Sequence, residues 1–184
     1  MTTKKIGTQT AALANPPSLA AWANVAGKKE GEGPLADTFD YIDGDDTFGE
    51  STWEKSESAM QKQALGLALN KAGQAASNLD WLFAGDLLNQ CIGSSFAARE
   101  QQLPFFGLYG ACSTMGEGLA LASMALDGGF GEWAAVTASS HFCSAERQYR
   151  TPLEYGGQRT PTAQWTTTAA GAAVLAREGP GPYI

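Results

Sequence analysis

One cysteine lies where its surroundings favour chemical reactivity. Residues 109–114 read YGACST, so an apolar run ends in a glycine turn, Cys112 follows, and a helical pattern begins. Free backbone N–H groups and the positive end of a helix dipole stabilise a thiolate at such a position. The segment predicts a nucleophilic or ligand-contacting Cys112 with Ser113 beside it. A small buried hydrophobic side chain is the alternative for a free cysteine.

The only histidine of the chain, His141, directly follows the apolar run 133–139. A cysteine that transfers acyl groups needs a base or a partner that stabilises charge. His141 and Cys112 are both expected at the carboxyl edge of a sheet, where open α/β folds bind ligands. His141 is therefore a candidate partner of Cys112. The alternative is a loop histidine that hydrogen-bonds to the backbone.

Two arginines, Arg147 and Arg150, lie close together in a chain with few cations. A guanidinium group presents a planar fork that suits a carboxylate or a phosphate. If their segment is a loop that folds over the same sheet edge, both arginines can receive an anionic ligand. The alternative is a pair of surface salt bridges with Glu146 or Glu154.

Metal and nucleotide sites have little support. Residues 43–54 match four ligand positions of a calcium loop, but Phe48 stands where that loop requires glycine. The three cysteines and His141 contain no C-x₂-C pair, which argues against zinc. Gly110 and Gly116 are not spaced as a phosphate-binding or dinucleotide-binding motif requires. The sequence predicts no metal and no cofactor.

The elements that position these residues alternate between short apolar runs and helical patterns. Strands are expected at 80–85, 105–109, 133–139 and 171–176, and helices at 53–71, 89–101 and 113–126. Ser51 or Thr52 is expected to cap the first helix, and Gly73 to end it. This alternation predicts an α/β fold with parallel strands joined by right-handed crossovers. The first fifty residues, rich in Gly, Pro and Asp, are expected to form loops.

Composition narrows the function classes. The chain has 184 residues, 43% of them hydrophobic and 17% charged, which is enough for one domain with a core. Its net charge of −7 and pI near 4.6 argue against nucleic-acid binding, which needs clustered cations. The sequence shows neither a secretory signal nor a membrane-spanning run, so a soluble or peripheral protein is expected. Three cysteines without a paired framework indicate free thiols in a reducing compartment.

A set of segments spread over the chain resembles a known family. These are EGEGPL (30–35), AGDLLNQ (84–90), YGACST (109–114), DGGF (127–130), SSH (139–141), ERQYR (146–150) and EYGGQ (154–158). In this order they resemble the stage V sporulation protein AD family of the thiolase-like superfamily. The resemblance implies a parallel-rich sheet flanked by helices, as one half of a duplicated αβαβα fold. Residues 1–184 then correspond to the N-terminal half, and the second half with its catalytic histidines is missing.

The resemblance also implies a function. It implies non-catalytic binding of dipicolinic acid for uptake into the developing spore, with membrane proteins of the same sporulation stage as partners. The expected location is the surface of the spore inner membrane. Cys112 matches the nucleophile position of the superfamily, and the ligand-binding candidates are Cys112, Ser113, His141, Arg147 and Arg150. The alternatives are an acyltransferase of the thiolase or ketoacyl-synthase type with Cys112 as nucleophile, and a folding scaffold that forms a homodimer.

Overall fold

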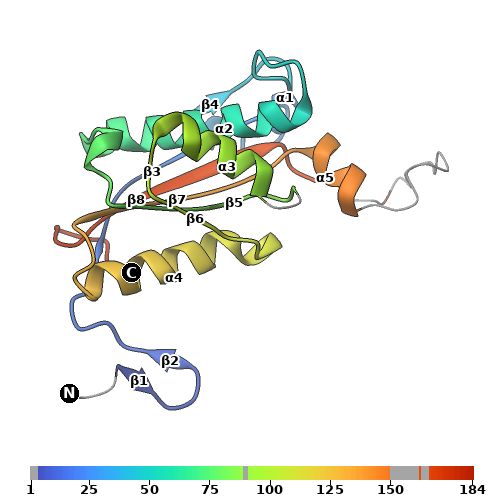
Figure 1. Ribbon diagram of the computed structural model, residues 1–184. Helices are drawn as coiled ribbons and strands as arrows, with labels where there is room; N and C mark the ends of the chain where they lie inside the picture. Colours follow the sequence, from blue (N-terminus) through green and yellow to red (C-terminus); the bar gives the residue numbers. More distant parts are fainter. Residues whose placement is uncertain (1–3, 89–90, 150–161, 163–165) are drawn as a thin grey trace.

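A six-stranded mixed sheet forms the centre of the molecule (Figure 1). The structure, a computed structural model, describes residues 4–88, 91–149, 162 and 166–184, without the side chains of 146–149. The strand order is β4-β3-β8-β7-β5-β6. The bounds are β3 Ser18–Ala26, β4 Tyr41–Ile42, β5 Trp81–Gly85, β6 Phe105–Gly107, β7 Trp133–Ser140 and β8 Ala169–Ala176.

Helices cover both faces of this sheet. Figure 1 shows α2 and α3 over one face and α4 over the other, while α5 lies beyond one end of the strands. One apolar cluster fills the space between α2 and the sheet, and a second lies between α4 and the sheet. The helices are α1 Lys28–Gly31, α2 Trp53–Ala72, α3 Ile92–Gln101, α4 Thr114–Asp127 and α5 Phe142–Tyr149, with single turns η1 Ala36–Thr38, η2 Ala76–Asn78 and η4 Ala111–Ser113.

The predicted helix at 53–71 is confirmed as α2, and both of its ends have the expected chemistry. The Thr52 side chain accepts a hydrogen bond from the Lys55 N–H at 3.3 Å, which satisfies one free donor of the first turn. Gly73 ends the helix in the left-handed conformation with φ +64°. The helix at 113–126 is confirmed as α4, and the strands at 80–85, 133–139 and 171–176 as β5, β7 and β8.

Three expectations were wrong. The first fifty residues are not all loops, because β3 is a nine-residue strand that pairs along its length with β8. The strand at 171–176 was expected to pair in parallel, but as β8 it runs antiparallel to both β3 and β7. Residues 146–149, expected as part of a loop, belong to the helix α5. The parallel pairs are β3 with β4, and β5 with β6 and β7.

One edge of the sheet is closed by side chains. β4 has only two residues, so most of the outer side of β3 has no strand beside it. Asp40 accepts from the Asn24 N–H at 3.0 Å, and the Lys71 ammonium donates to the Trp22 carbonyl at 3.0 Å. Lys71 also pairs with Asp40 at 2.6 Å. Charged groups that occupy backbone positions in this way prevent another strand from adding to an edge.

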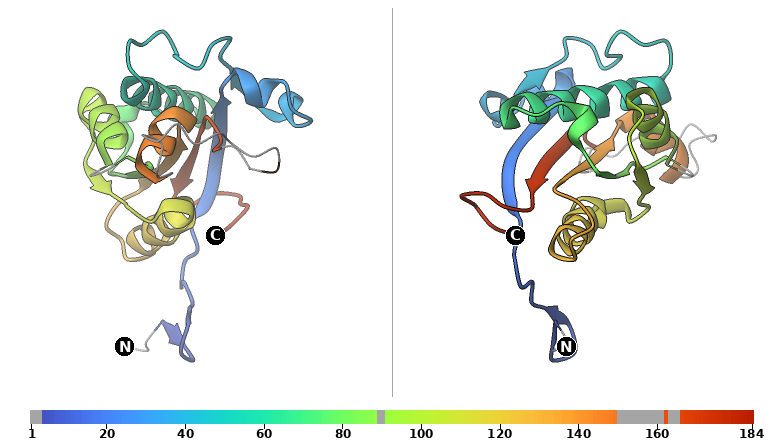
Figure 2. Two further views of the ribbon diagram at one scale, coloured as in Figure 1. Left: turned by 90° about the vertical axis from the view of Figure 1, so that its right-hand side faces the viewer. Right: turned by 60° about the vertical axis from the view of Figure 1, so that its left-hand side comes forward.

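The N-terminal arm leaves the body on the side of α4. Its hairpin, β1 Lys5–Ile6 and β2 Thr10–Ala11, extends away from the sheet in both views of Figure 2. The Asp127 carboxylate at the end of α4 is the anchor: it pairs with Lys4 and accepts from the backbone N–H of Ala14 at 3.3 Å and of Asn15 at 2.8 Å. Its side chain is only 1% exposed. The Lys4 hydrogen bond holds the pKa of Asp127 below its usual value.

Replacement by alanine should have opposite effects on stability at Gly66, within α2, and at Gly73, which ends the helix. Gly66 lies inside the helix and a Cβ there meets nothing within 4 Å, so Gly66→Ala is expected to raise the free energy of unfolding by about 1 kcal/mol. Gly73 needs a positive φ, so Gly73→Ala is expected to lower it by about 1 kcal/mol. Urea unfolding of both variants measures the two changes. Equal effects at the two positions would contradict this assignment of the helix end.

Candidate functional site

The segment that carries Cys112 is packed tightly against the end of β5. A Cβ added to Gly85 would lie 2.2 Å from the Leu108 carbonyl oxygen, and one added to Gly110 would lie 2.5 Å from Glu117 Oε2. Gly85 therefore requires glycine, because the atom it approaches is backbone, whereas at Gly110 the Glu117 and Ser113 side chains would have to move. These close approaches fix the backbone on both sides of the cysteine turn against the sheet and against α4.

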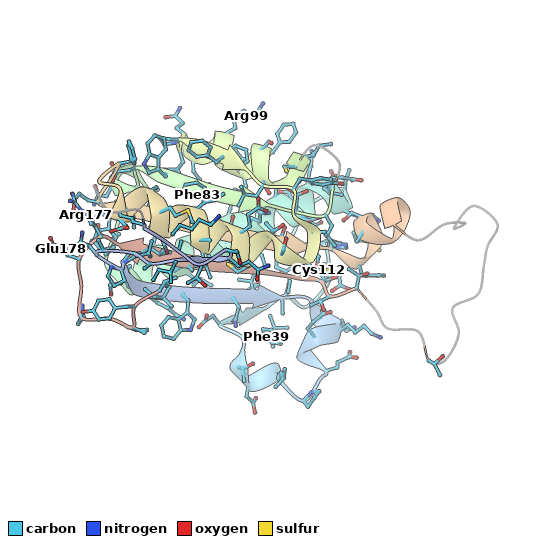
Figure 3. The ribbon with its side chains drawn as sticks, turned by 90° about the horizontal axis from the view of Figure 1, so that it is seen from below. Phe39, Phe83, Arg99, Cys112, Arg177 and Glu178 are labelled. Carbon is cyan, nitrogen blue, oxygen red and sulfur yellow. The ribbon has the colours of Figure 1, made fainter. Side chains whose placement is uncertain are left out.

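Cys112 itself is exposed, in the single turn η4 that leads into α4. It is therefore not the small buried hydrophobic group of the alternative interpretation. The preceding residue, Ala111, has φ +47°, an uncommon conformation for a residue with a side chain. Ser113 donates its hydroxyl to the Gly110 carbonyl at 2.7 Å, which closes the turn. Figure 3 shows Cys112 at one end of α4, with Arg177 and Glu178 at the other.

His141 lies just after β7, and its side chain is fully buried. Its Nδ1 accepts from the Cys143 N–H at 3.2 Å, so the proton is on Nε2, which lies 2.8 Å from the Asp46 carbonyl oxygen. The ring packs on Trp53 at 5.1 Å and on Phe142 at 5.6 Å between centroids. Burial lowers the pKa of His141 and so favours its neutral form.

This arrangement limits what His141 can do for Cys112. Cys112 follows β6 and His141 follows β7, and both strands run parallel to β5 between them, so the two residues reach the same edge of the sheet. Both ring nitrogens of His141 are, however, bonded to the backbone, as the alternative interpretation of this residue required. A general base needs a free nitrogen that points at the proton it removes. The role of His141 in ligand binding stays a prediction.

The two predicted arginines are only partly within the described structure. Arg147 lies on α5, but its side chain is not among those described. Arg150 and the segment 154–158 lie outside the described residues. Their roles as anion ligands stay predictions. Among the described side chains, no three His, Cys, Asp or Glu residues are grouped so that they could hold a metal ion.

A buried acid pair, which the sequence analysis missed, lies below this edge of the sheet. Asp86 follows β5 and is 2% exposed, and Glu57 on α2 is fully buried. The Asp86 carboxylate accepts three hydrogen bonds: from the Leu88 N–H at 2.8 Å, the Ser94 N–H at 2.7 Å and the Ser94 hydroxyl at 2.6 Å. These three donors hold the Asp86 carboxylate in place below the sheet edge.

Glu57 holds the proton of this pair. Burial, followed by the charge of Asp86, raises its pKa to about 7. The Ser144 hydroxyl lies 3.0 Å from both Glu57 Oε2 and the His141 carbonyl oxygen, but it has one proton to donate. If Ser144 donates this proton to the His141 carbonyl oxygen, a protonated Glu57 carboxyl donates its own proton to the Ser144 oxygen. The Ser139 hydroxyl is bonded to the other Glu57 oxygen at 2.9 Å.

Gln61 is the third polar residue of this buried cluster, and its spacing from Glu57 is the sequence signal by which the cluster could have been predicted. Its Nε2 lies 3.1 Å from the Gly85 carbonyl oxygen, 2.9 Å from the Ser94 hydroxyl and 2.7 Å from the Ser139 hydroxyl. Glu57 and Gln61 are four residues apart on α2, in phase with the buried Ala64 and Ala68. A carboxyl and an amide within an apolar helical stripe were therefore the available signal.

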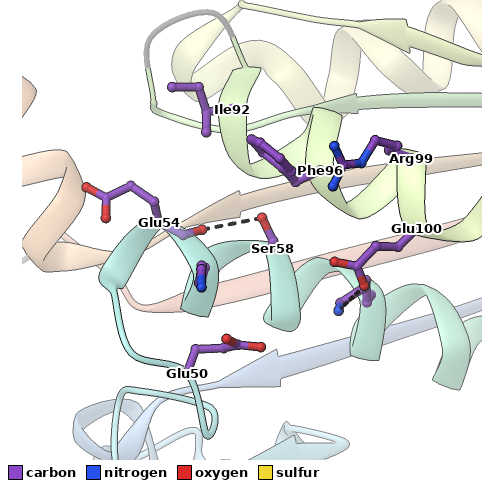
Figure 4. A pocket seen from close by; sticks show the side chains of 9 residues that line it. Glu50, Glu54, Ser58, Ile92, Phe96, Arg99 and Glu100 are labelled. Carbon is purple, nitrogen blue, oxygen red and sulfur yellow. Dashed lines mark hydrogen bonds and ion pairs between the residues drawn. The ribbon is translucent and has the colours of Figure 1, made fainter.

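A groove elsewhere on the molecule does not include any predicted site residue. It lies between α2 and α3, encloses about 320 Å³, and is shown in Figure 4. Two of its cationic side chains already have partners within the groove. Lys62 pairs with Glu100 at 2.6 Å, and the Arg99 guanidinium lies 4.8 Å from the centroid of the Phe96 ring. Its lining includes three acids and three bases, so it presents no net charge to an anion. The lining residues are Glu50, Glu54, Lys55, Ser58, Lys62, Ile92, Phe96, Arg99 and Glu100.

The proton on Glu57 makes stability depend on pH. The pKa of Glu57 is raised from 4.5 to about 7 on folding, so its contribution is complete below about pH 4.5 and is lost as the pH rises through 7. In the unaltered chain, we expect the free energy of unfolding to fall by about 3 kcal/mol over this pH range. Glu57→Gln should remove this fall. Glu178→Gln, at an exposed position, is the matched control and should keep the fall. Urea unfolding at a series of pH values measures the slopes, and the same slope in both variants would contradict the assignment.

Comparison with known proteins decides the family. The sequence profile described as "Stage V sporulation protein AD" matches residues 7–184. This chain belongs to the stage V sporulation protein AD family. Stage V sporulation protein AD of Bacillus subtilis (strain 168) is 40% identical over 174 residues, which cover 95% of this chain and 52% of the relative. The chain thus spans about half the length of the curated relative that it matches.

Solved structures show the fold of this family member. The 3-oxoacyl-[acyl-carrier-protein] synthase III of Aquifex aeolicus VF5 superposes with a TM-score of 0.60 at 16% identity, covering 88% of this chain and 54% of that one. The OleA H285N protein of Xanthomonas campestris superposes with a TM-score of 0.58 at 17% identity, covering 88% and 56%. The chain therefore has the predicted thiolase-like α/β fold. Its assignment as an N-terminal half stays a prediction.

Proposed function

We propose that this chain serves sporulation by binding dipicolinic acid (pyridine-2,6-dicarboxylate) without catalysis, for uptake into the developing spore. Membership in the stage V sporulation protein AD family supports the sporulation role. The observation that favours binding over catalysis is the bonding of His141. Both of its nitrogens are bonded to the backbone, so the one histidine of the chain is not poised to activate Cys112.

The proposed binding site lies around the exposed cysteine turn. The ligand carries two carboxylates, and the chain as a whole carries a net charge of −7, so recognition needs local positive groups. The positive end of the dipole of α4, a helix of 14 residues, provides one such region beside Cys112 and Ser113. Arg147 and Arg150 provide the guanidinium forks, and each would meet one carboxylate.

The proposed setting is the surface of the spore inner membrane, beside the other membrane proteins of this sporulation stage. No helix among the described residues is both long and apolar enough to cross a membrane. Attachment through such partners is consistent with that finding. Partners and location both follow from the family resemblance.

Removing the arginines should weaken dipicolinate binding. We expect Arg147→Gln and Arg150→Gln each to raise the dissociation constant about 10- to 100-fold, because each loses a charge-assisted hydrogen bond. Titration calorimetry of this chain with dipicolinate measures the change. Arg177→Gln is the matched control, since Arg177 pairs with Glu132 at the far end of α4. No binding by the unaltered chain, or equal losses in all three variants, would contradict the proposal.

Acyl transfer with Cys112 as nucleophile is the second candidate function. The observation in its favour is the exposure of Cys112 in the turn before α4, on a fold shared with a 3-oxoacyl synthase. The proposal of binding without catalysis predicts that an acyl thioester leaves Cys112 unmodified. Intact-mass spectrometry after incubation with acetyl-coenzyme A tests this, with Cys112→Ser as control. An acetyl adduct that is lost in Cys112→Ser would favour the enzyme instead.

A further inference from the structure

The helix α5 is attached to the body mainly by hydrogen bonds. Among its described side chains, those of residues 142–145, only Ser144 and Ala145 are buried. The Phe142 N–H donates to the Thr168 hydroxyl at 3.2 Å. Neither of the two apolar clusters of the core includes a described residue of this helix, which lies beyond one end of the strands (Figure 1). Little apolar surface therefore holds α5 in place.

Ser144 connects α5 to the buried acid Glu57 of α2. Its hydroxyl lies 3.0 Å from Glu57 Oε2 and 3.0 Å from the His141 carbonyl oxygen. With a proton on Oε2, the Glu57 carboxyl donates to the Ser144 oxygen, and Ser144 donates to the His141 carbonyl. The other Glu57 oxygen accepts from the Ser139 hydroxyl at 2.9 Å. Each of these groups then has a partner, and the carboxyl carries no charge.

Loss of that proton leaves two carboxylates in one buried cluster. A Cβ added to Gly93 would lie 3.3 Å from Asp86 Oδ2 and 3.4 Å from Glu57 Cγ, so both acids pack against the same residue of α3. Among the described side chains, no Lys or Arg pairs with either acid. Two like charges without a counter-charge are costly where water is excluded. The cluster must then admit water, which requires a surrounding element to move.

Of the three helices around this cluster, α5 can move at the least cost. α2 buries nine of its residues, and α3 buries four, including the apolar Ala97 and Ala98. α5 has eight residues, and its described part buries only the side chains of Ser144 and Ala145. Segments with little buried apolar surface are the first to open in a folded protein. Opening of α5 therefore relieves the ionisation of Glu57.

We propose that Glu57, Asp86 and Ser144 form a latch that holds α5 at the sheet edge while Glu57 is protonated and releases it when Glu57 ionises. The proton passes from Glu57 to bulk water, and Ser144 turns its hydroxyl from the His141 carbonyl to the new carboxylate. Because α5 carries Arg147, release of the helix displaces one of the candidate ligand residues. This effect on the ligand rests on the proposed function, whereas the opening of α5 does not.

The latch should change state near pH 7, the pKa to which burial and the charge of Asp86 raise Glu57. Burial lowers the pKa of His141 from 6.5 and raises that of Cys91 from 9.0, so neither has its midpoint between these two values. α5 also carries Glu146 and Arg147, whose side chains are not among those described. The titratable groups on the elements around Glu57 are Glu54 on α2, Asp86 after β5, Cys91 before α3, His141 after β7 and Cys143 on α5.

Hydrogen exchange of the α5 amides, followed by mass spectrometry, tests the latch without any ligand. Opening that brings Glu57 into water lets its pKa return toward 4.5, so the opening equilibrium should rise about 10-fold between pH 6 and pH 8. This rise is measured after correction for the intrinsic exchange rate. Residues 64–69 of α2 report global unfolding and should exchange far more slowly than α5. An α5 that opens equally at both pH values, or only together with α2, overturns the proposal.

Glu57→Gln is the decisive variant. Its amide donates to Ser144 as the protonated carboxyl does, but it cannot ionise. We therefore expect α5 of this variant to open to the same extent at pH 6 and pH 8. Glu178→Gln, at an exposed position, is the matched control and should keep the rise. Circular dichroism checks that both variants fold, and a rise in Glu57→Gln equal to that of the unaltered chain overturns the proposal.

Two serine variants test the contact itself. Ser144→Ala removes the hydrogen bond between α2 and α5 and should raise the opening of α5 at pH 6 about 5-fold. Ser58→Ala is the matched control, because Ser58 is also buried but donates to the Gly93 carbonyl of α3 at 2.9 Å. It should leave the opening of α5 unchanged. No effect of Ser144→Ala, or an equal effect of both variants, overturns the role of Ser144 and with it the latch.

Dipicolinate binding tests the consequence for the ligand. The unaltered chain should bind dipicolinate more weakly at pH 8 than at pH 6, by at most about 10-fold, and Glu57→Gln should lose this difference. Titration calorimetry at both pH values measures it. The same pH dependence in both chains would contradict the link between α5 and the ligand. Absence of binding at either pH would contradict the proposed function but not the latch, which the hydrogen exchange of α5 decides.

Discussion

The antiparallel strand β8 is the constraint on which the rest of the molecule depends. It lies between β3 and β7 and pairs with each of them through all eight of its residues. It therefore connects β3 to the part of the sheet that contains β7, β5 and β6. Its sequence, AAGAAVLA, alternates small side chains between the two faces. Ala170, Ala172 and Val174 belong to the core under α2, whereas Ala173 and Leu175 belong to the core under α4. Small residues in the central strand let the helices on both faces pack close to the sheet.

The sequence predicted the parts of the fold that have strong local signals. α2 and α4 were predictable because each combines a helical period with recognisable ends, such as Thr52 and Gly73. β3 was missed because the surrounding Gly, Pro and Asp residues outweigh the weak alternation of 18–26. The direction of β8 was wrong because an apolar run predicts a strand but contains no information on its orientation. That orientation is set by pairing with β3, which is distant in the sequence.

The candidate site was also only partly predictable from the sequence. The placement of Cys112 at the start of α4 follows from local pattern, as does the position of His141 after β7. The Glu57–Asp86 pair does not, because its members come from different elements and meet only in the folded chain. Folding buries several polar residues of α2, and two of them, Glu57 and Gln61, lie beneath the sheet edge. The raised pKa of Glu57 lets it bind a proton near neutral pH, which limits the negative charge buried in this interior.

The anchoring of the N-terminal arm has a consequence for handling this protein. Residues 4–15 extend away from the sheet (Figure 1), so they could be taken for a dispensable N-terminal tail. They nevertheless contribute the cation and the backbone donors for the Asp127 carboxylate, at the end of a helix whose dipole repels negative charge. Trimming the chain to its visible body would leave that carboxylate without its counter-charge. Cleavage within the arm would therefore loosen the C-terminal end of α4.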